Sequence, residues 1–209
     1  MSIKENIIAI MNKVAIAAKK SNRNLDEIKL LVVTKTYSAS IIDEALSAGA
    51  KYIGENKIQE AETKLPELSQ KCDEFHFIGH LQSNKIKKLI PLKPALIHSL
   101  DKISTARKLD SYLKKFDLKQ NVLIQVNTSN EKSKFGISPN ETDEFIQEMS
   151  KFENIQVKGL MTIGLNSNDE EKIRECFKSL NKLFNKYKKT QFPNIEMKYL
   201  SMGMTNDFE

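Results

Sequence analysis

The sequence predicts an α/β fold, a TIM-like (β/α)8 barrel in which parallel strands alternate with helices. Short apolar runs rich in β-branched residues recur along the 209-residue chain, and a helical stretch separates each run from the next. No glycine-rich GxGxxG segment favours the alternative, an open doubly wound sheet. Right-handed crossovers would place the helices outside the barrel.

An extra amphipathic helix is predicted before the barrel. Apolar residues recur there at helical spacing, namely at Ile3, Ile7, Ile10, Val14 and Ala18. We expect this helix to end near Ser21. The first strand is predicted from Leu30 to Lys35, a run that is apolar on both faces and ends in a polar residue. Such a run is typical of a buried parallel strand whose carboxyl end reaches a site.

Six further strands follow. They are predicted at Tyr52–Gly54, Phe75–Gly79, Ala95–Ser99, Val122–Asn127, Val157–Ile163 and Met197–Ser201. Capping motifs predict two helix starts, at Ser138-Pro139-Asn140-Glu141 and at Ser167-Asn168-Asp169-Glu170. A closed barrel has eight strands. We therefore expect a single barrel domain over residues 1–209, with the eighth strand missing.

The composition fits a globular protein, with 40% hydrophobic and 29% charged residues. No apolar run has the length of a membrane span and no signal-peptide core follows Met1, so we expect a cytoplasmic protein. The net charge of +6 comes from lysines spread along helix faces, without a dense basic block. This spread argues against nucleic acid or a membrane as a partner.

The cysteines and histidines do not indicate a metal site. Cys72 and Cys176 form no CxxC pair, and we interpret both as ordinary thiols. The three histidines (His76, His80 and His98) occur without an HExxH motif or clustered carboxylates. We therefore predict no bound metal.

Lys35 is the first candidate for chemistry. Alternation along its strand places Leu31, Val33 and Lys35 on one face, so the ammonium could project into the barrel mouth. Apolar strand ends around it would desolvate the amine in part, which favours nucleophilic attack on an aldehyde. The alternative is a lysine that simply extends into solvent at a strand end. Position alone leaves the two interpretations open.

Polar residues also follow the other predicted strands. Asn56 could bind a ligand after the second strand, or could cap the next helix. His80 could face a ligand after the third strand, or lie in a plain loop. At the last strand, the Ser201 hydroxyl and the close backbone approach allowed by Gly203 could hold a phosphate, as the loops after strands seven and eight of this fold often do. A simple strand-to-helix turn is the alternative there.

Together these segments resemble the pyridoxal phosphate homeostasis protein family, the PROSC-like group with an alanine racemase N-terminal type of barrel. The matching segments are Val33–Thr36, Gly54–Asn56 with Gln59-Glu60, Phe75–Lys85, His98-Ser99, Gln125–Asn127, Lys134–Gly136, Gly159–Met161 and Leu200–Met204. They span nearly the whole chain in family order. The Phe75–Lys85 run and the Ser201–Met204 turn are the most specific of them.

The resemblance implies a cofactor, pyridoxal 5′-phosphate (PLP), and assigns residues to it. Lys35 would be the Schiff-base lysine, with Asn56 and His80 beside the cofactor. Met161 would line the same pocket, and Ser201 with the Gly203 turn would hold the phosphate. The family continues with a helix and a last strand that face the pyridine nitrogen and complete the phosphate cup, so we expect this chain to be C-terminally incomplete relative to the family.

The resemblance also implies a carrier of PLP rather than a catalyst. Racemisation needs a base on each side of the substrate carbon, and related alanine racemases take one from an added β-domain. We therefore expect a monomer without a catalytic residue that stores PLP and releases it to amino acids, other amines or PLP-dependent apo-enzymes. Two alternatives stay open: a weak PLP-dependent amino-acid racemase, and a cofactor-free phosphate-ligand or interaction protein.

Overall fold

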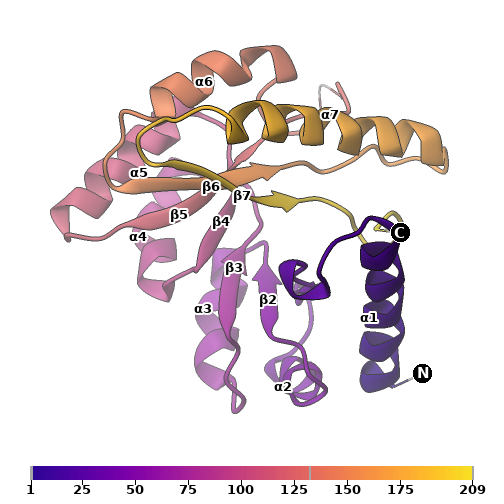
Figure 1. Cartoon of the computed structure of the whole chain (residues 1–209). Coiled ribbons are helices and arrows are strands. Elements are labelled where there is room, and N and C mark those ends of the chain that lie inside the picture. Colours follow the sequence, from indigo (N-terminus) through magenta and orange to yellow (C-terminus); the bar gives the residue numbers. More distant parts are fainter. Residues whose placement is uncertain (1, 132, 209) are drawn as a thin grey trace.

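Seven parallel strands form one sheet in the computed structural model, which describes residues 2–131 and 133–208. The strands are β1 (Leu31–Val33), β2 (Tyr52–Glu55), β3 (Glu74–Phe77), β4 (Leu96–Leu100), β5 (Gln120–Gln125), β6 (Ile155–Met161) and β7 (Ile195–Ser201). Strands that follow one another in the chain pair in parallel, so β1 and β7 are the edges of the sheet. The sheet curves as a partial barrel wall (Figure 1). The prediction of a TIM-like fold is confirmed, and no eighth strand occurs among the described residues.

The α-helices alternate with the strands as predicted. They are α1 (Ile3–Lys20), α2 (Ala39–Ser47), α3 (Ile58–Glu67), α4 (Ile86–Leu89), α5 (Ile103–Lys115), α6 (Thr142–Met149) and α7 (Glu170–Lys188). The predicted cap at Ser138 is confirmed, because Ser138 and Glu141 form a capping box before α6. The predicted start of the next helix is also confirmed, because α7 begins at Glu170, but Ser167 is not its N-cap. Asp169 caps α7, and the Ser167 hydroxyl instead accepts a hydrogen bond from the Asp169 amide.

The first strand is shorter than predicted. β1 ends at Val33, and Lys35 lies in the turn that follows it. Thr36 has a φ of 69°, in the left-handed region, which ends the extended conformation and turns the chain toward α2. Lys35 is therefore presented by a turn and not by the last residue of a strand.

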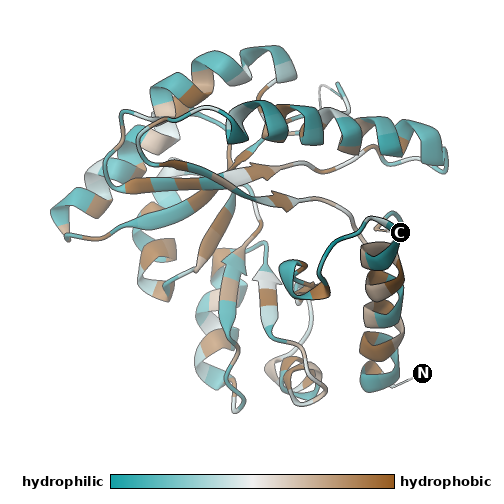
Figure 2. Cartoon of the chain, viewed as in Figure 1, coloured by the Kyte–Doolittle hydropathy of each residue, from teal (hydrophilic) through white to brown (hydrophobic). Residues whose placement is uncertain are grey.

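An extensive apolar layer covers the outer face of the sheet, and a small apolar cluster lies apart from it. The outer layer fills the space between the strands and the helices, and its fully buried residues include Ile53, Phe77, Ile97, Leu109 and Ile146. Figure 2 shows apolar residues along the strands and on helix faces. A smaller cluster of Leu96, Leu123 and Met161 packs with Tyr199 apart from this layer. Burial of each large aliphatic side chain stabilises the fold by about 2 kcal/mol.

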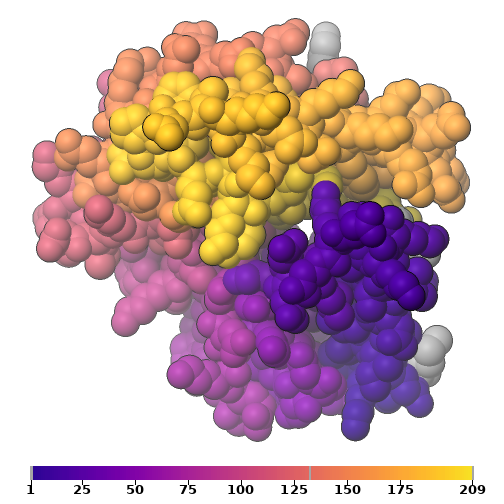
Figure 3. Space-filling model, in the orientation of Figure 1, coloured from indigo at the N-terminus to yellow at the C-terminus, as the bar shows by residue number. Residues whose placement is uncertain are grey.

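The C-terminal segment lies beside the end of α1 that is opposite to the chain's N-terminus (Figure 1), and the N-terminal and C-terminal parts of the chain adjoin in the space-filling view (Figure 3). α1 runs beside the C-terminal segment, and the Lys13 ammonium lies 5.9 Å from the centre of the Phe208 ring. Lys29 extends this link between N-terminal and C-terminal parts. Its ammonium lies 4.6 Å from the centre of the Tyr52 ring on β2 and 5.4 Å from that of Tyr199 on β7.

Candidate functional site

The carboxyl ends of the strands bring the predicted site residues to one edge of the sheet. Lys35 follows β1, Asn56 follows β2, His80 follows β3, and Met161 and Ser201 end β6 and β7. Because all seven strands are parallel and form one curved sheet, these ends share one edge, which we call the site rim. Sites of TIM-type folds form at this edge.

Lys35 is held by its two neighbours. The Thr34 hydroxyl donates to Glu55 Oε1 at 2.7 Å, and the Thr36 amide donates to Glu60 Oε2 at 2.9 Å. The Lys35 side chain itself is exposed and makes no hydrogen bond or ion pair with the described residues. The expected partial desolvation of this lysine is therefore wrong, because β1 forms an edge of the described sheet and leaves the side chain open to water.

An ionic cluster behind the Lys35 turn keeps that turn in place. Lys64 Nζ donates to Glu55 Oε1 at 3.0 Å, to Glu60 Oε2 at 2.7 Å and to the Thr34 carbonyl at 3.1 Å. The Glu55 side chain is only 1% exposed. Hydrogen bonds from Lys64 and then from the Thr36 amide lower the pKa of Glu60 to about 2. Burial alone would lower the pKa of Lys64, but its bonds to Glu60 and Glu55 raise it, so both groups are charged at neutral pH.

Asn56 does not cap the next helix. α3 starts at Ile58 with Lys57 in the N-cap position, so the capping interpretation of Asn56 is wrong. The side-chain oxygen Oδ1 of Asn56 is buried and has no hydrogen-bond partner within the described structure. The backbone of Gly79 packs tightly against Asn56, since a Cβ on this glycine would lie 1.9 Å from the Asn56 carbonyl oxygen. The two strand ends can approach this closely only with glycine at position 79.

His80 lies at the site rim after the end of β3. Its ring stacks on Phe135 with 3.8 Å between ring centres and 11° between planes. Its Nδ1 is 3.8 Å from Asp101 Oδ2, too far for a hydrogen bond. This buried nitrogen has no hydrogen-bond partner within the described residues. Asn56 Oδ1 and His80 Nδ1 are thus two buried polar atoms at the rim that a ligand could satisfy.

Ser201 and Gly203 occupy the end of β7. Gly203 has a φ of 87°, in the left-handed region, and packs on Phe208. The Met204 amide donates to the Asp207 carboxylate, which occupies this amide in the turn. The Ser201 hydroxyl lies 2.8 Å from Nδ1 of His98, so it connects the rim to the barrel interior.

The sequence-based interpretation missed the partners of Ser201. His98 Nε2 lies 2.8 Å from His76 Nδ1, and His76 Nε2 lies 2.8 Å from Glu74 Oε2. Glu74 in turn accepts a hydrogen bond of 2.6 Å from Lys29. Glu74 and His76 alternate on β3, a pattern that indicates one face of a strand, and this signal could have suggested a polar interior.

Burial keeps the histidines neutral. It lowers the pKa of His98 to about 3, with a further contribution from the neighbouring His76. Burial also lowers the pKa of His76, although the Glu74 carboxylate opposes this effect. For Glu74, burial would raise the pKa, but the hydrogen bonds from Lys29 and His76 outweigh it and hold the pKa below its usual value.

Within residues 2–131 and 133–208, no three histidine, cysteine or acidic side chains are grouped so that they could hold a metal ion. Cys72 and Cys176 are both free thiols. Over the same residues, none of the helices combines the length and apolar character needed to cross a membrane. A hollow of about 450 Å³ lined by Ser83, Arg107 and Tyr112 contains no residue of the site rim.

The chain is similar to known proteins over nearly its whole length. The family model described as Alanine racemase, N-terminal domain matches residues 6–209. Pyridoxal phosphate homeostasis proteins of Helicobacter pylori (strain ATCC 700392 / 26695) and Escherichia coli (strain K12) are both 35% identical to the chain. The alignments cover 100% and 99% of this chain and 91% and 88% of those proteins. The chain belongs to the pyridoxal phosphate homeostasis protein family.

Solved structures extend the comparison within and beyond this family. An unknown protein from Bifidobacterium adolescentis is 33% identical with a TM-score of 0.92, over 98% of this chain and 87% of that one. PipY of Synechococcus elongatus PCC7942, solved with PLP bound, is 27% identical with a TM-score of 0.80, over 99% of this chain and 91% of that one. An alanine racemase of Clostridium difficile 630 shares the fold at 15% identity and a TM-score of 0.64, covering 91% of this chain and 52% of the racemase.

Proposed function

We propose that this chain binds pyridoxal 5′-phosphate as a Schiff base on Lys35 and takes part in intracellular vitamin B6 homeostasis by releasing it to amines or apo-enzymes. The observation that carries the proposal is the Lys35 turn. It presents an ammonium group without a partner among the described residues, on a backbone held at Thr34 and Thr36. Asn56 and His80 on the same rim each keep a buried polar atom unsatisfied.

The family supports this cofactor. The PipY relative was solved with PLP bound, and relatives that align over nearly the whole chain carry the name pyridoxal phosphate homeostasis protein. The residues present fit such a ligand. Lys35 can supply an amine, Asn56 and His80 can donate or accept hydrogen bonds, and Ser201 offers a hydroxyl next to the Gly203 turn.

Each rim residue has a distinct role in this proposal. The Lys35 amine, once it loses a proton to solvent, can attack an aldehyde. Asn56 and His80 orient the bound ring, with His80 kept in place by its stacking on Phe135. Met161 supplies an apolar contact, and Ser201 with Gly203 holds the phosphate. When bound, PLP supplies an electron sink for amine substrates. We infer storage and delivery of PLP rather than racemisation. Racemisation needs a base on each side of the substrate carbon, and related alanine racemases take one of these bases from an added β-domain.

The absorption spectrum tests the Schiff base. Incubation with PLP should give a visible absorption band, and borohydride should trap the cofactor on Lys35. The Lys35→Ala variant should show neither the band nor the trapped cofactor. Lys57→Ala is the matched control, because Lys57 is also an exposed lysine near the rim, with a side chain 61% exposed. Absence of the band in the unmodified chain, or its persistence in Lys35→Ala, would overturn the proposal. Absence would favour a cofactor-free phosphate-ligand or interaction protein.

A weak amino-acid racemase is the second candidate function, and His80 favours it. Its Nδ1 lies at the rim without a hydrogen-bond partner among the described residues, so it could accept a proton as a general base. Hydrogen isotope exchange at the α-carbon of several amino acids distinguishes the two functions. Exchange that requires both Lys35 and His80 would support catalysis. A carrier should instead show no isotope exchange and should transfer PLP to an apo-enzyme. Sedimentation of the loaded protein tests the expected monomer.

A further inference from the structure

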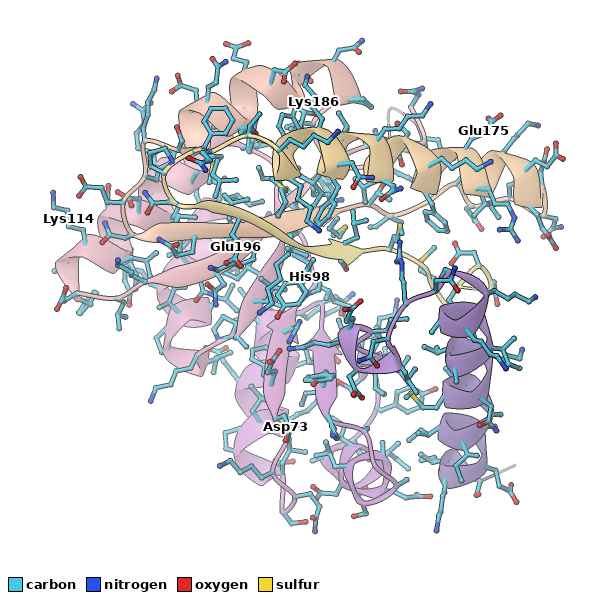
Figure 4. All side chains as sticks on the ribbon, viewed as in Figure 1. Asp73, His98, Lys114, Glu175, Lys186 and Glu196 are labelled. Carbon is cyan, nitrogen blue, oxygen red and sulfur yellow. The ribbon has the colours of Figure 1, made fainter. Side chains whose placement is uncertain are left out.

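A line of hydrogen bonds runs through the barrel interior to the site rim. It links Lys29, Glu74, His76, His98 and Ser201, with each successive pair of side-chain atoms 2.6 to 2.8 Å apart. We call this set the interior relay. Figure 4 shows His98 lying between β7 and β3, as its two contacts require. The relay begins at Lys29 before β1, enters the sheet at Glu74 at the start of β3 and reaches the end of β7 at Ser201.

The chemistry of each group fixes the direction of the hydrogen bonds in the relay. Glu74 is ionised beside Lys29 and can only accept, so Nε2 of His76 must carry a hydrogen. Neutral His76 then has a bare Nδ1, which must accept from Nε2–H of His98. Neutral His98 has a bare Nδ1 in turn, so it must accept from the Ser201 hydroxyl.

This direction of the hydrogen bonds disfavours the binding of an anion at Ser201. The hydroxyl hydrogen of Ser201 is committed to His98, and only oxygen lone pairs remain for a ligand at the rim. A phosphate dianion also presents only acceptors and would therefore meet no donor at Ser201. One added proton on the histidine pair reverses the hydrogen bond between His98 and Ser201, because Nδ1–H of His98 then donates to Ser201 Oγ. The hydroxyl hydrogen becomes free to donate to the anion.

We propose that the interior relay makes anion binding at Ser201 proton-coupled: a phosphate-like dianion binds together with one proton, taken from solvent onto the His76–His98 pair. This inference rests on the proposed phosphate role of Ser201 and goes further, since it assigns Glu74, His76 and His98 as positioning residues. The balance is simple. One N–H bond forms on the pair, the Ser201 hydroxyl keeps its hydrogen and changes its acceptor, and no other bond changes.

The groups around the pair support uptake of that proton. Glu74 on β3 contacts His76 directly, and Lys29, from the segment before β1, binds Glu74. The Tyr52 ring on β2 lies 6.3 Å from that of His76, and Tyr199 on β7 lies beside the Lys29 ammonium. The Glu74 carboxylate favours the charged pair, whereas Lys29 and burial oppose it. A bound dianion adds negative charge at Ser201 and therefore shifts the balance toward the protonated pair.

Sulfate is a suitable probe because it stays a dianion across the tested pH range and does not need the Lys35 amine. Between about pH 8 and about pH 6, sulfate affinity should rise up to about tenfold per pH unit, as linkage to one proton requires. Nitrogen NMR of labelled histidines should show that the His76–His98 pair takes up a proton from solvent when sulfate binds. The Ser201→Ala variant should bind sulfate weakly and without this dependence.

Two variants test the direction of the relay. In His98→Asn, the amide can donate to Ser201 without an added proton, so sulfate binding should become independent of pH. In Glu74→Gln, the amide can donate to His76 Nε2, and the pH dependence should also be lost. Either variant alone suffices if the other fails to fold. Substitution of a residue with a purely structural role would change the stability of the protein but not the slope of sulfate affinity against pH.

Several results would overturn the inference: sulfate that fails to bind, sulfate binding that is independent of pH in the unmodified chain, or a slope that survives in both variants. The outcome is separate from that of the Lys35 proposal. Loss of the PLP band with intact proton-coupled sulfate binding would contradict only the Schiff base. A normal PLP band with pH-independent sulfate binding would contradict only the relay.

Discussion

The backbone amide of Thr36, the residue after Lys35, donates a hydrogen bond of 2.9 Å to Oε2 of Glu60. The same carboxylate oxygen accepts from Lys64, which also binds the carbonyl of Thr34 on the other side of Lys35. The lysine proposed to carry the cofactor is therefore positioned by groups on α3 that touch its backbone neighbours. This arrangement leaves the Lys35 side chain free while it restrains the backbone.

Removal of the Lys64 charge should destabilise the fold. In Lys64→Met, the Glu55 carboxylate, 1% exposed, would stay buried without its cation, and this should cost about 3 kcal/mol in the free energy of unfolding. Urea denaturation followed by circular dichroism measures the change. Lys57→Met is the control, since the Lys57 side chain is 61% exposed in its ion pair with Glu60, and it should change stability by less than about 0.5 kcal/mol. Equal losses in the two variants would contradict this explanation.

A methyl group at position 79 should disrupt the rim. The Cβ of Gly79→Ala would lie 1.9 Å from the Asn56 carbonyl oxygen, so the backbones of the two strand ends must separate. We expect a loss of at least about 3 kcal/mol in stability or failure to fold. Gly54→Ala is the graded control, because its nearest neighbour is the Leu31 side chain at 3.3 Å, which can move. Thermal melting compares the two, and a Gly79→Ala protein as stable as the parent would rule out the contact.

Stability should fall in mild acid because His98 is buried and neutral. Its pKa is lowered to about 3 in the folded chain, so the unfolded chain binds a proton at higher pH than the folded one. The contribution of neutral His98 to the free energy of unfolding is fully present above the unfolded pKa of about 6.5. It declines as the pH falls, by about 3 kcal/mol at about pH 4. Urea midpoints measured across this range test it. His98→Asn should flatten the dependence, and an unchanged pH profile in that variant would assign it to other groups.

The Tyr187 hydroxyl should hold α7 on α6. It donates a hydrogen bond of 2.9 Å to Asp143, and burial together with this carboxylate raises the pKa of the phenol. Tyr187→Phe should lose about 1 kcal/mol in chemical denaturation, the value of one such bond. Lys186→Met should lose less, since the Lys186 side chain is 52% exposed in its ion pair with Asp143. The reverse order would contradict a role for the buried hydroxyl.

The sequence predicted the seven strands because each is a short apolar run with helical spacing between the runs. It predicted the rim because the ends of parallel strands share one edge of the sheet. The interior relay depends instead on contacts between residues far apart in the chain. His98 and Ser201 are 103 residues apart, and their contact follows from the curvature of the sheet, which alternation along one strand does not specify. The exposure of Lys35 likewise depends on which strand forms an edge.

The order of the strands has a consequence for how the chain folds. Each strand pairs only with its neighbours in sequence, from β1 to β7, so no pairing must wait for a distant part of the chain. Contacts between near neighbours carry a small entropy of loop closure, and such topologies fold faster than those built on distant pairings. The sheet can therefore grow by one strand and one helix at a time as the polypeptide leaves the ribosome. Ser201 would meet His98 only after the last of these units has been added.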